Sequence, residues 1–552
     1  MPIPYLKPTA TSQQLIVNGE PYLMLAAELQ NSALTSAKYM QEVWPKLRGA
    51  NINTALGCVT WEQIEPEEGK FDFAVFDKVV ADARAAEIHL VLLWFGSFKN
   101  GISTYTPAWM KTDQKRFPRA KLRQAHGELK TGDVLSIFHT AAQEADVKAF
   151  TKLMEHVKDI DEKHSTILMV QVENETGLLG DSRDGGPAAE KRFNEPVPSD
   201  VLKMLNAERE NLRPELQQTL RNFSKSSKGS WPEVFGQSRQ TDELFMAYYY
   251  AIYLEQVASA GKSVYPIPLY TNVWQNYVGA DADPNMPVVV GGGGTPGEYP
   301  SGGGVVNVLD VWQMFAPSLD FIAPDVYLND YATSCAKYRH RNQPLFIPEQ
   351  RRDEYGARRI WTAYGTYAAL GTSPFGIDTL TPETNPFRRH YALMNQVSKH
   401  VLAAQRDQTS VGFFFDELNT TGVLDTSPPT HAKFGPWNLT IERSFVFGKA
   451  GPGWGMVIHQ GGAKFMLIGC GFQVKFKHES AGFTGILSFD EKEVAENGDL
   501  STLRMLNGDE TRGGGQCIMP NDEPDYGGFP ICVTIPARTC VAECEAYALE
   551  DE

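Results

Sequence analysis

Eight short apolar runs recur through the first 377 residues of the chain, and they constrain its fold more than any other feature. Several are apolar throughout rather than alternating, which is typical of parallel strands covered on both faces. We interpret them as eight buried strands. The runs are Tyr22–Ala27, Ile52–Cys58, Ile88–Phe95, Ile167–Val172, Pro268–Trp274, Phe321–Tyr327, Leu345–Pro348 and Pro374–Ile377.

Amphipathic stretches separate these runs and favour helices between the strands, as in Ser36–Arg48, Phe73–Ala86, Ala142–Lys158 and Asp242–Ala260. Eight strands that alternate with helices predict an α/β fold of the (β/α)₈ TIM barrel type. A doubly wound sheet is the alternative, but eight units and the lack of a phosphate-binding loop disfavour it. The glycine-rich segment Val288–Val306 has no Gly-Lys-Ser/Thr, so we interpret it as a loop after the fifth strand.

The character of the sequence changes after about residue 405. Short alternating runs appear there, punctuated by Gly, Pro, Asn and Asp, which is the pattern of an all-β domain of sandwich type. These runs are Val411–Phe415, Gly455–His459, Phe465–Ile468, Gln473–Phe476 and Ile531–Ile535. We therefore predict a barrel over residues 1–405 and a C-terminal β-rich accessory domain over residues 406–552.

Two of the predicted barrel strands end in a glutamate. The fourth run leads into Glu173-Asn174-Glu175, and the seventh ends at Glu349. Barrel enzymes carry their chemistry at the carboxyl ends of strands. Hydrolysis of a glycosidic bond needs one carboxyl group to protonate the leaving oxygen and a second to attack the anomeric carbon or activate water. One strand-end glutamate alone could equally cap a helix or form an ion pair, but two of them at these strands, with Asn174 before the first, favour catalysis.

Three further motifs carry a resemblance to known enzymes. The segment from Cys58 to Phe73, with Trp61, Glu65-Pro66, Gly69 and Phe71, resembles the Trp-x-x-x-Glu-Pro-x-x-Gly-x-Phe-x-Phe signature of β-galactosidases in glycoside hydrolase families 35 and 42. Together with the segments 25–31 and 92–109, it makes the barrel resemble the microbial branch of family 35 (GH35, clan A) that carries a C-terminal β-domain. Members of that branch include galactosidases acting on xyloglucan side chains.

This resemblance implies roles for the two glutamates. In clan A an Asn-Glu pair on the fourth strand provides the acid/base, which is Glu175 here, and a glutamate on the seventh strand provides the nucleophile, which is Glu349. The implied function is that of a retaining exo-acting β-galactosidase. It would remove terminal non-reducing β-D-galactosyl residues from oligosaccharides, xyloglucan-derived ones among them, by double displacement.

Glu173 is the ambiguity within the pair. Alternation along a strand places Glu173 and Glu175 on one side and Asn174 on the other. The strand end must therefore twist or bulge if Asn174 is also to reach the sugar. The Asn-Glu order favours Glu175 as the acid, and we expect Glu173 to be a supporting carboxylate that helps to raise the pKa of Glu175.

Seven further side chains are expected to contact the substrate. Trp61 is expected at the barrel mouth. Glu28 ends the first strand and could make a polar contact to a sugar hydroxyl group. Asn272 and Trp274 end the fifth strand, where they could offer a hydrogen bond and a stacking face. Tyr327 is placed to donate a hydrogen bond to the nucleophile on the adjacent strand. The full set is Glu28, Trp61, Trp94, Asn174, Asn272, Trp274 and Tyr327.

One position departs from the family pattern. Animal family 35 enzymes carry a tyrosine near the sugar where this chain has Cys58. The contact to the 4-hydroxyl group that distinguishes galactose from glucose is therefore not assigned. Two alternatives stay open on these grounds, namely another exo-β-glycosidase (a β-glucosaminidase or a β-glucosidase) and a non-catalytic carbohydrate-binding protein on the same scaffold.

Composition excludes several other classes. The net charge of −16 argues against nucleic acid binding through a general electrostatic field. No apolar run reaches transmembrane length and no signal peptide is visible, so we expect no membrane partner and a cytoplasmic location. The 11 histidines and seven cysteines form no metal-ligand pattern, so no metal and no cofactor is expected. A homo-oligomer, a disulfide among the C-terminal cysteines, and the role of the accessory domain (polysaccharide binding, packing on the barrel or dimerisation) are left open.

Overall fold

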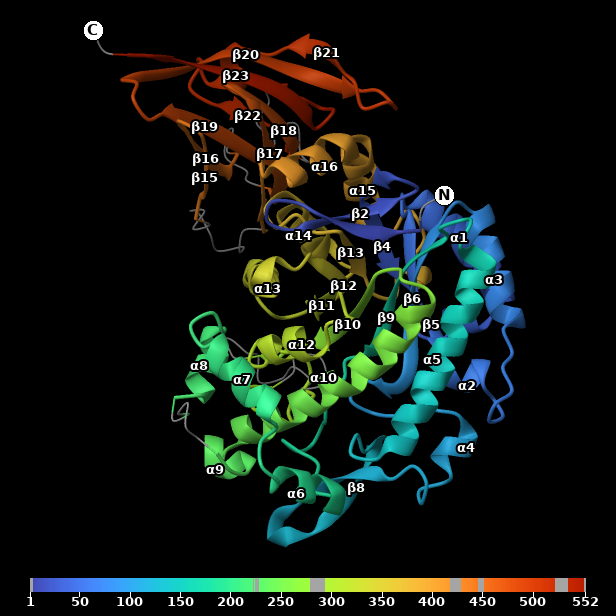
Figure 1. The fold of residues 1–552 in the computed structure, drawn as a ribbon. Coiled ribbons are helices and arrows are strands. Elements are labelled where there is room, and N and C mark those ends of the chain that lie inside the picture. The colour runs from blue at the N-terminus through green and yellow to red at the C-terminus, as the bar shows by residue number, and fades with distance from the viewer. Residues whose placement is uncertain are drawn as a thin grey trace.

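The computed structural model describes residues 3–221, 223, 228–277, 293–416, 428–444, 451–521 and 535–550. Its centre is an eight-stranded parallel sheet in the order β11-β10-β9-β6-β5-β4-β13-β12. A parallel bridge between Val326 and Gln350 joins the two end strands, which closes the sheet into the expected barrel (Figure 1). The strands are β4 (Met24–Glu28), β5 (Thr54–Thr60), β6 (His89–Lys99), β9 (Ile167–Asn174), β10 (Leu269–Trp274), β11 (Phe321–Asp325), β12 (Phe346–Gln350) and β13 (Gly371–Pro374).

Helices surround the barrel and fill the connections between its strands. The four predicted helices are confirmed as α1, α3, α5 and α10, and an excursion of short helices, α6 to α9, lies between β9 and α10. The helices are α1 (Ala37–Gly49), α2 (Trp61–Ile64), α3 (Ala74–Ala85), α4 (Ala108–Lys111), α5 (Thr140–Asp161), α6 (Pro187–Phe193), α7 (Ser199–Ala207), α8 (Pro214–Thr219), α9 (Trp231–Phe235), α10 (Arg239–Val264), α12 (Leu309–Phe315), α13 (Tyr331–Tyr338), α14 (Glu354–Gly365), α15 (Phe387–Gln396) and α16 (Ser398–Asp407).

Alternation along each strand divides the barrel core into two layers. Tyr270, Phe321 and Phe346 fill the interior, where the rings of Tyr270 and Phe321 stack at 5.0 Å. Their strand neighbours Leu269 and Ile322 face the surrounding helices instead. Because the side chains alternate, a polar residue at a strand end faces the cavity only if it is an even number of residues from the interior side chains of its strand. We refer to this relation as sharing the same parity.

The eighth strand is displaced from its prediction. The apolar run Pro374–Ile377 was expected to form it, but β13 is Gly371–Pro374, and Ile377 begins a 3₁₀ helix. The reason is close packing, because a Cβ at Gly371 would lie 2.7 Å from the Cβ of Met24 on β4. A strand that packs this tightly uses small residues, and its Gly-Thr-Ser-Pro sequence hides it from a search for apolar runs.

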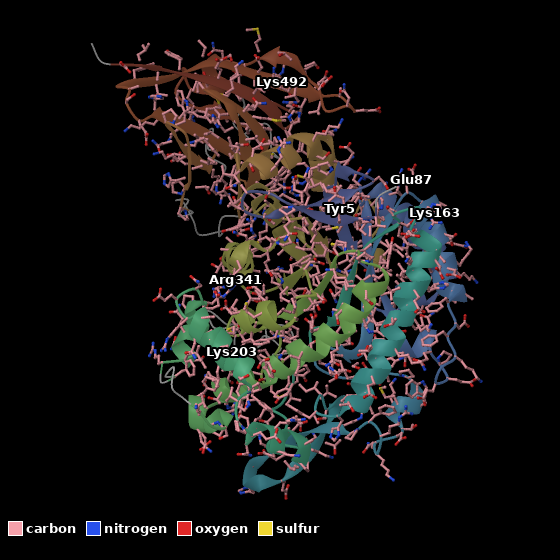
Figure 2. All side chains as sticks on the ribbon, viewed as in Figure 1. Tyr5, Glu87, Lys163, Lys203, Arg341 and Lys492 are labelled. Carbon is pink, nitrogen blue, oxygen red and sulfur yellow. The ribbon has the colours of Figure 1, made fainter. Side chains whose placement is uncertain are left out.

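Two small sheets lie outside the barrel and were not expected. The strands β1 (Tyr5–Pro8), β2 (Gln13–Val17) and β3 (Glu20–Pro21) form an antiparallel sheet at the N-terminus. The strands β7 (Arg119–Arg123) and β8 (Leu129–Leu135) form a hairpin after β6. Charged side chains such as Lys163 and Lys203 lie on the outer surface (Figure 2). Within the described ranges, no helix is both long and apolar enough to cross a membrane.

The C-terminal region is all-β, as expected. A six-stranded sheet, β14-β17-β18-β23-β20-β21, faces a four-stranded sheet, β15-β16-β19-β22. The predicted run Ile531–Ile535 lies, except for its last residue, outside the described residues. The strands are β14 (Ser410–Phe415), β15 (Thr430–Phe434), β16 (Trp437–Arg443), β17 (Gly453–Gly461), β18 (Lys464–Cys470), β19 (Phe472–His478), β20 (Phe483–Val494), β21 (Leu500–Met505), β22 (Cys517–Ile518) and β23 (Val541–Leu549).

One face of the six-stranded sheet packs against the four-stranded sheet, and its opposite face packs on the barrel. Along β17, Trp454, Met456 and Ile458 belong to the barrel core, whereas Val457, between the last two, belongs to the core of the sandwich. Trp454 stacks on Trp361 of α14 with ring centres 5.1 Å apart. Asp416 accepts two hydrogen bonds from Arg359 of the same helix, at 2.8 and 2.7 Å. Since α14 follows the strand that carries Glu349, the C-terminal sheet supports the helix next to the site.

Candidate active site

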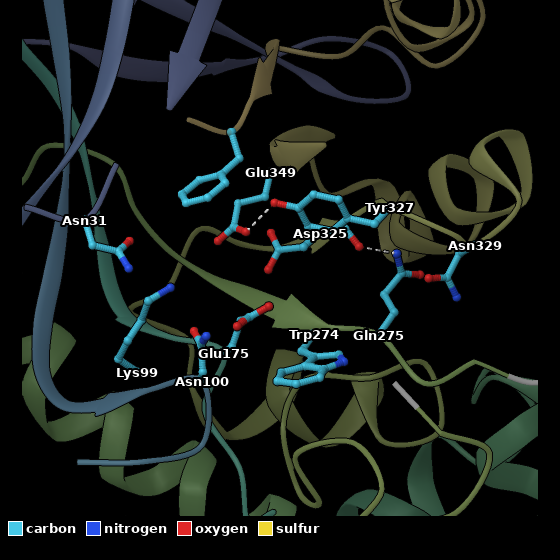
Figure 3. Close-up of a pocket in the computed structure, with 11 residues that line it drawn as sticks. Asn31, Lys99, Asn100, Glu175, Trp274, Gln275, Asp325, Tyr327, Asn329 and Glu349 are labelled. Carbon is cyan, nitrogen blue, oxygen red and sulfur yellow. Dashed lines mark hydrogen bonds between the residues drawn. The ribbon is translucent and has the colours of Figure 1, made fainter. Parts of the chain in front are cut away.

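A cavity of about 400 Å³ opens at the carboxyl ends of the barrel strands (Figure 3). In this view Lys99 and Asn31 border one side, Tyr327 and Asn329 border the opposite side, and Glu175 and Glu349 lie between them. The structure therefore brings the two predicted glutamates to one cavity. Its lining consists of Asn31, Lys99, Asn100, Glu175, Trp274, Gln275, Asp325, Tyr327, Asn329, Glu349 and Phe375.

Glu349 is surrounded by hydrogen-bond donors. The Tyr327 hydroxyl donates to its Oε2 at 2.8 Å, as the sequence predicted. The side-chain amides of Asn272 and Asn174 donate to Oε1 at 3.3 and 3.5 Å. Donors that point at a carboxylate stabilise its charged form and fix its orientation. Three donors thus fix the orientation of the Glu349 carboxyl group.

Glu175 is held by its backbone, and its carboxyl shares a side-chain hydrogen bond with the Asp325 carboxyl. Its amide N–H donates to Asn272 Oδ1 at 2.9 Å, and its carbonyl accepts from Gly101 at 3.1 Å. Burial and then the charge of Glu349 raise the pKa of Glu175 to about 7, although the Lys99 ammonium works in the opposite direction. A carboxyl group with this pKa holds a proton near neutral pH, as a general acid requires.

The end of β9 leaves regular strand geometry at both glutamates. Glu173 and Glu175 have φ angles of +60° and +45°, which is the left-handed region that costs a non-glycine residue about 1 kcal/mol. This confirms the expected twist, because Asn174 and Glu175 both reach the neighbourhood of Glu349. Strain of this kind persists where neighbouring contacts hold it in place.

Glu173 lies behind the cavity and holds two strands together. Its carboxylate accepts hydrogen bonds from the backbone N–H groups of Ser97 and Phe98, at 3.0 and 2.7 Å. These residues precede Lys99 on β6, so Glu173 ties the end of β6 to the end of β9. The expectation that Glu173 raises the pKa of Glu175 is wrong, since burial and Glu349 are the causes that raise it.

Asp325 is a third carboxyl group at the site, and the sequence prediction missed it. One oxygen from each of Glu175, Asp325 and Glu349 lies within 4.8 Å of the others. Asn272 donates to Asp325 at 2.8 Å, and burial, followed by the charge of Glu349, raises the pKa of Asp325. Among the described residues these three carboxyls converge closely enough to hold a metal ion, but no histidine or cysteine joins them.

The described part of the glycine-rich segment packs against the chain that follows Glu175. Leu178 and Ser301 form an antiparallel bridge between the two loops. At Gly177, whose φ is +147°, a Cβ would lie 2.5 Å from the Pro300 carbonyl, and at Gly303 it would lie 2.3 Å from the Thr176 oxygen. The segment is a loop after the fifth strand, as expected, and its glycines permit close backbone contact beside Glu175. Residues 288–292 of that prediction lie outside the described residues.

Trp61 and Trp94 do not line the cavity, which corrects their assignment to the substrate. Trp94 shares the parity of Leu90 and Leu92, so it faces the helices, where its Nε1 donates to Asp146 of α5 at 3.0 Å. Trp61 is fully buried beside it, and its Nε1 donates to Glu65 at 2.7 Å. Both tryptophans pack the layer between barrel and helices.

The other predicted contacts lie at or near the cavity. Trp274 and Tyr327 line it, and Asn174 and Asn272 reach it through Glu349. Glu28 is fully buried and is not part of the lining, and neither of its carboxyl oxygens has a hydrogen-bond partner among the residues that the structure describes. Cys58 is buried as well, and its thiol contacts Asn31 Oδ1 at 4.0 Å. Asn31, rather than Cys58, therefore presents a polar group to the cavity on this side.

Lys99 and Asn31 are the most informative lining residues that the sequence prediction missed. Lys99 ends β6 within a segment, Phe95–Asn100, that was considered only for its resemblance, and Asn31 follows β4 by three residues. A signal was available for Asp325, which shares the interior parity of Phe321 and Ala323. A charged residue at the interior position of a strand end points to the cavity of a barrel.

Two family models match parts of this chain. Residues 34–223 match the glycoside hydrolase family 42 model, described as Beta-galactosidase. Residues 387–517 match a model described as Domain of unknown function (DUF5597). The first match includes Glu175 and relates the barrel to the clan A glycoside hydrolases. The matching model is that of family 42, so the narrower resemblance to family 35 is not confirmed.

Curated and solved relatives cover the chain only in part. A β-galactosidase from Xanthomonas manihotis is 27% identical over 172 residues, which are 30% of this chain and 26% of that protein. The chain thus matches about a quarter of the length of this relative. The β-galactosidase structure from Bacillus circulans has a TM-score of 0.40 at 16% identity, covering 64% of this chain and 50% of that one. The structure from Marinomonas ef1 has a TM-score of 0.45 at 12% identity, covering 70% and 62%.

Proposed function

We propose that the protein is a retaining, exo-acting β-galactosidase that hydrolyses terminal β-D-galactosyl residues of oligosaccharides. The observation that carries this proposal is the contrast between two carboxyls less than 4.8 Å apart at their nearest oxygens. Glu349 accepts from three donors, whereas Glu175 has a pKa raised to about 7. A protonated acid beside an ionised nucleophile is the ground state that double displacement needs.

In the first step Glu349 attacks the anomeric carbon while Glu175 gives its proton to the leaving oxygen. The glycosidic C–O bond breaks as the bond to the Glu349 oxygen forms, which yields a glycosyl-enzyme and a free alcohol. In the second step Glu175, now a carboxylate, takes a proton from water. The water oxygen displaces Glu349 from the anomeric carbon, and both groups return to their starting states.

The geometry supports retention rather than inversion. Retaining enzymes hold their carboxyl groups about 5–5.5 Å apart, whereas inverting enzymes separate them by about 6.5–9.5 Å to leave room for water. Nearest oxygens within 4.8 Å favour the shorter class. A cavity of about 400 Å³ is at the small end of ligand sites, which favours a terminal sugar over an internal polymer segment.

The galactose assignment is supported by the two β-galactosidase matches and by the resemblance of segment 58–73. A panel of 4-nitrophenyl β-glycosides tests it, with the galactoside, glucoside and N-acetylglucosaminide compared by kcat/KM. We expect the galactoside to have the highest kcat/KM, and we expect the Glu349→Gln variant to lose its activity on this substrate. The exposed Glu383→Gln is the matched control and keeps full activity. A higher kcat/KM for the glucoside or the N-acetylglucosaminide would overturn the assignment of galactose as the sugar. Unchanged turnover in Glu349→Gln would overturn the catalytic assignment.

A further inference from the structure

Lys99 is the one basic side chain in the described cavity lining, and the steps above do not use it. It is the last residue of β6 and only 7% exposed. Its Nζ lies 4.9 Å from the centre of the Phe95 ring. Within the described residues no carboxylate oxygen lies within 4.0 Å of it, although Glu28, Glu175 and Glu349 surround it at longer range.

A buried ammonium without a direct partner is costly unless charge compensates it. Burial lowers the pKa of Lys99, but Glu349, Glu175 and Glu28 outweigh burial and hold that pKa above its usual value. Lys99 is therefore charged, and its three N–H donors have no acceptor among the described side chains. They point into the cavity, where a ligand can satisfy them (Figure 3).

The position of Lys99 decides which part of a ligand it meets. Lys99 and Asn31 border the side of the cavity opposite Tyr327 and Asn329, with the catalytic carboxyls between the two sides. A sugar whose anomeric carbon lies at Glu349 extends its other hydroxyl groups toward one of these sides. The side with Lys99 offers N–H donors from an ammonium and an amide, which suit hydroxyl oxygens as acceptors.

The charge balance of the cavity limits the ligand further. Lys99 is one cation among Glu28, Glu175, Asp325 and Glu349, and Glu349 must be ionised for the reaction. Lys99 is thus already matched by the nucleophile. An anionic sugar would add a second negative charge beside Glu349, and the low-dielectric surroundings would make that repulsion strong.

We propose that Lys99 binds the glycon directly, donating hydrogen bonds from Nζ to hydroxyl groups of a neutral sugar on the side of the cavity shared with Asn31. The same ammonium stabilises Glu349 as a carboxylate by charge. This inference rests on the proposed glycosidase function and names the residue and the sugar class through which the site acts. It makes Lys99 a specificity-determining residue for neutral over anionic glycosides.

The direct test is a cycle that removes the amine and the hydroxyl groups in turn. Wild type and Lys99→Met are assayed with the best neutral 4-nitrophenyl glycoside from the panel and with its 3-, 4- and 6-deoxy analogues. For wild type, we expect removal of at least one of these hydroxyl groups to lower kcat/KM about 10- to 100-fold relative to the parent glycoside. For Lys99→Met, removal of the same hydroxyl group should lower kcat/KM by less than about twofold. Losses that add independently at all three positions overturn the contact.

Charge and hydrogen bonding are separated by two further variants. Lys99→Arg keeps the charge and Lys99→Gln keeps an N–H donor without it. Loss of the charge moves the alkaline limb of the kcat/KM profile to higher pH, because the Lys99 ammonium lowers the pKa of Glu175. We expect this shift in Lys99→Gln and not in Lys99→Arg. The surface variant Lys111→Met, which also removes one positive charge, is the control and shifts nothing.

The preference for neutral sugars has its own readout. Wild type should turn over 4-nitrophenyl β-D-glucuronide at less than about 1% of its best neutral substrate, since like charges in a buried site repel. A glucuronide as best substrate, with that preference lost in Lys99→Gln, overturns the neutral class. If no glycoside is turned over at all, the proposed function fails. If neutral glycosides are turned over but the cycle is additive and the pH profile does not move, only the role of Lys99 fails.

Discussion

The ends of the fourth and seventh strands carry the same functional group in opposite surroundings. At the seventh strand, Glu349 receives hydrogen bonds from Tyr327, Asn272 and Asn174. At the fourth strand, Glu175 is anchored through its backbone, and burial with the charge of Glu349 raises its pKa to about 7. Because both carboxyls are almost fully buried, the difference between them lies in the groups that surround each one.

Asn272 lies between the two strand ends and contacts both glutamates. Its Oδ1 accepts from the backbone of Glu175, while its Nδ2 donates to Glu349 and Asp325. One side chain therefore fixes the position of Glu175 and contributes a donor to Glu349. The four changes that follow break this arrangement to different extents.

Removal of the nucleophile is expected to have the largest effect. Glu349→Gln leaves the shape of the cavity but cannot form the glycosyl-enzyme, so kcat should fall by about 10⁴-fold or more. Steady-state assays with the best nitrophenyl glycoside measure this loss. A fall of less than about tenfold would show that another group attacks the sugar.

Removal of the acid is expected to cost less and to depend on the leaving group. In Glu175→Gln, kcat/KM should fall about 10²- to 10⁴-fold for alkyl glycosides and far less for dinitrophenyl glycosides, which need no proton. Wild-type kcat/KM should decline as pH rises through about 7, because Glu175 is active when protonated. This decline should vanish in the variant. Glu173→Gln is the matched comparison, and a leaving-group dependence there instead would move the acid to Glu173.

Loss of one donor to Glu349 should have an intermediate effect. Tyr327→Phe removes the 2.8 Å hydrogen bond without changing the ring. A hydrogen bond to a charged group is worth about 1.5–3 kcal/mol, so kcat/KM should fall about 10- to 100-fold. Steady-state assays with the best nitrophenyl glycoside measure this loss. A loss of less than about twofold would contradict the role of this donor.

The smallest effect on catalysis is expected at Trp94. Trp94→Phe loses the bond to Asp146 and part of the packing between barrel and helices, which should lower the free energy of unfolding by about 2 kcal/mol. Thermal unfolding measures the loss, and KM should stay within about twofold of wild type. Trp274→Phe, at a residue that lines the cavity, is the comparison and should raise KM with little change in unfolding. If Trp94→Phe instead raised KM with little change in unfolding, Trp94 would be a substrate contact after all.

Apolar runs predicted most of the barrel because buried parallel strands must be apolar on both faces. They failed at β13, where contact with Met24 requires small residues, and for β1 to β3, which lie outside the barrel. The two glutamates were found because each directly follows such a run. Trp94 was misplaced because its parity with Leu90 and Leu92 was not applied.

Other parts of the site depend on long-range packing that sequence does not display. Lys99 and Asn31 come from different strand ends to the same side of the cavity, and no local pattern relates them. The left-handed residue Glu173 accepts hydrogen bonds from β6, which lies more than seventy residues earlier in the chain. The support of α14 by the C-terminal sheet likewise emerges only from the packed domains.

The central claim is that Glu349 forms the covalent bond to the sugar. Incubation with a 2-deoxy-2-fluoro-β-D-galactosyl fluoride slows both steps and allows the glycosyl-enzyme to accumulate, and mass spectrometry of the digested protein then locates the added sugar. We predict one fluorogalactosyl group per chain, on the peptide that contains Glu349, together with time-dependent inactivation. A label on Glu175, Asp325 or any other residue would contradict the account, as would inactivation-free turnover that releases the α-anomer first.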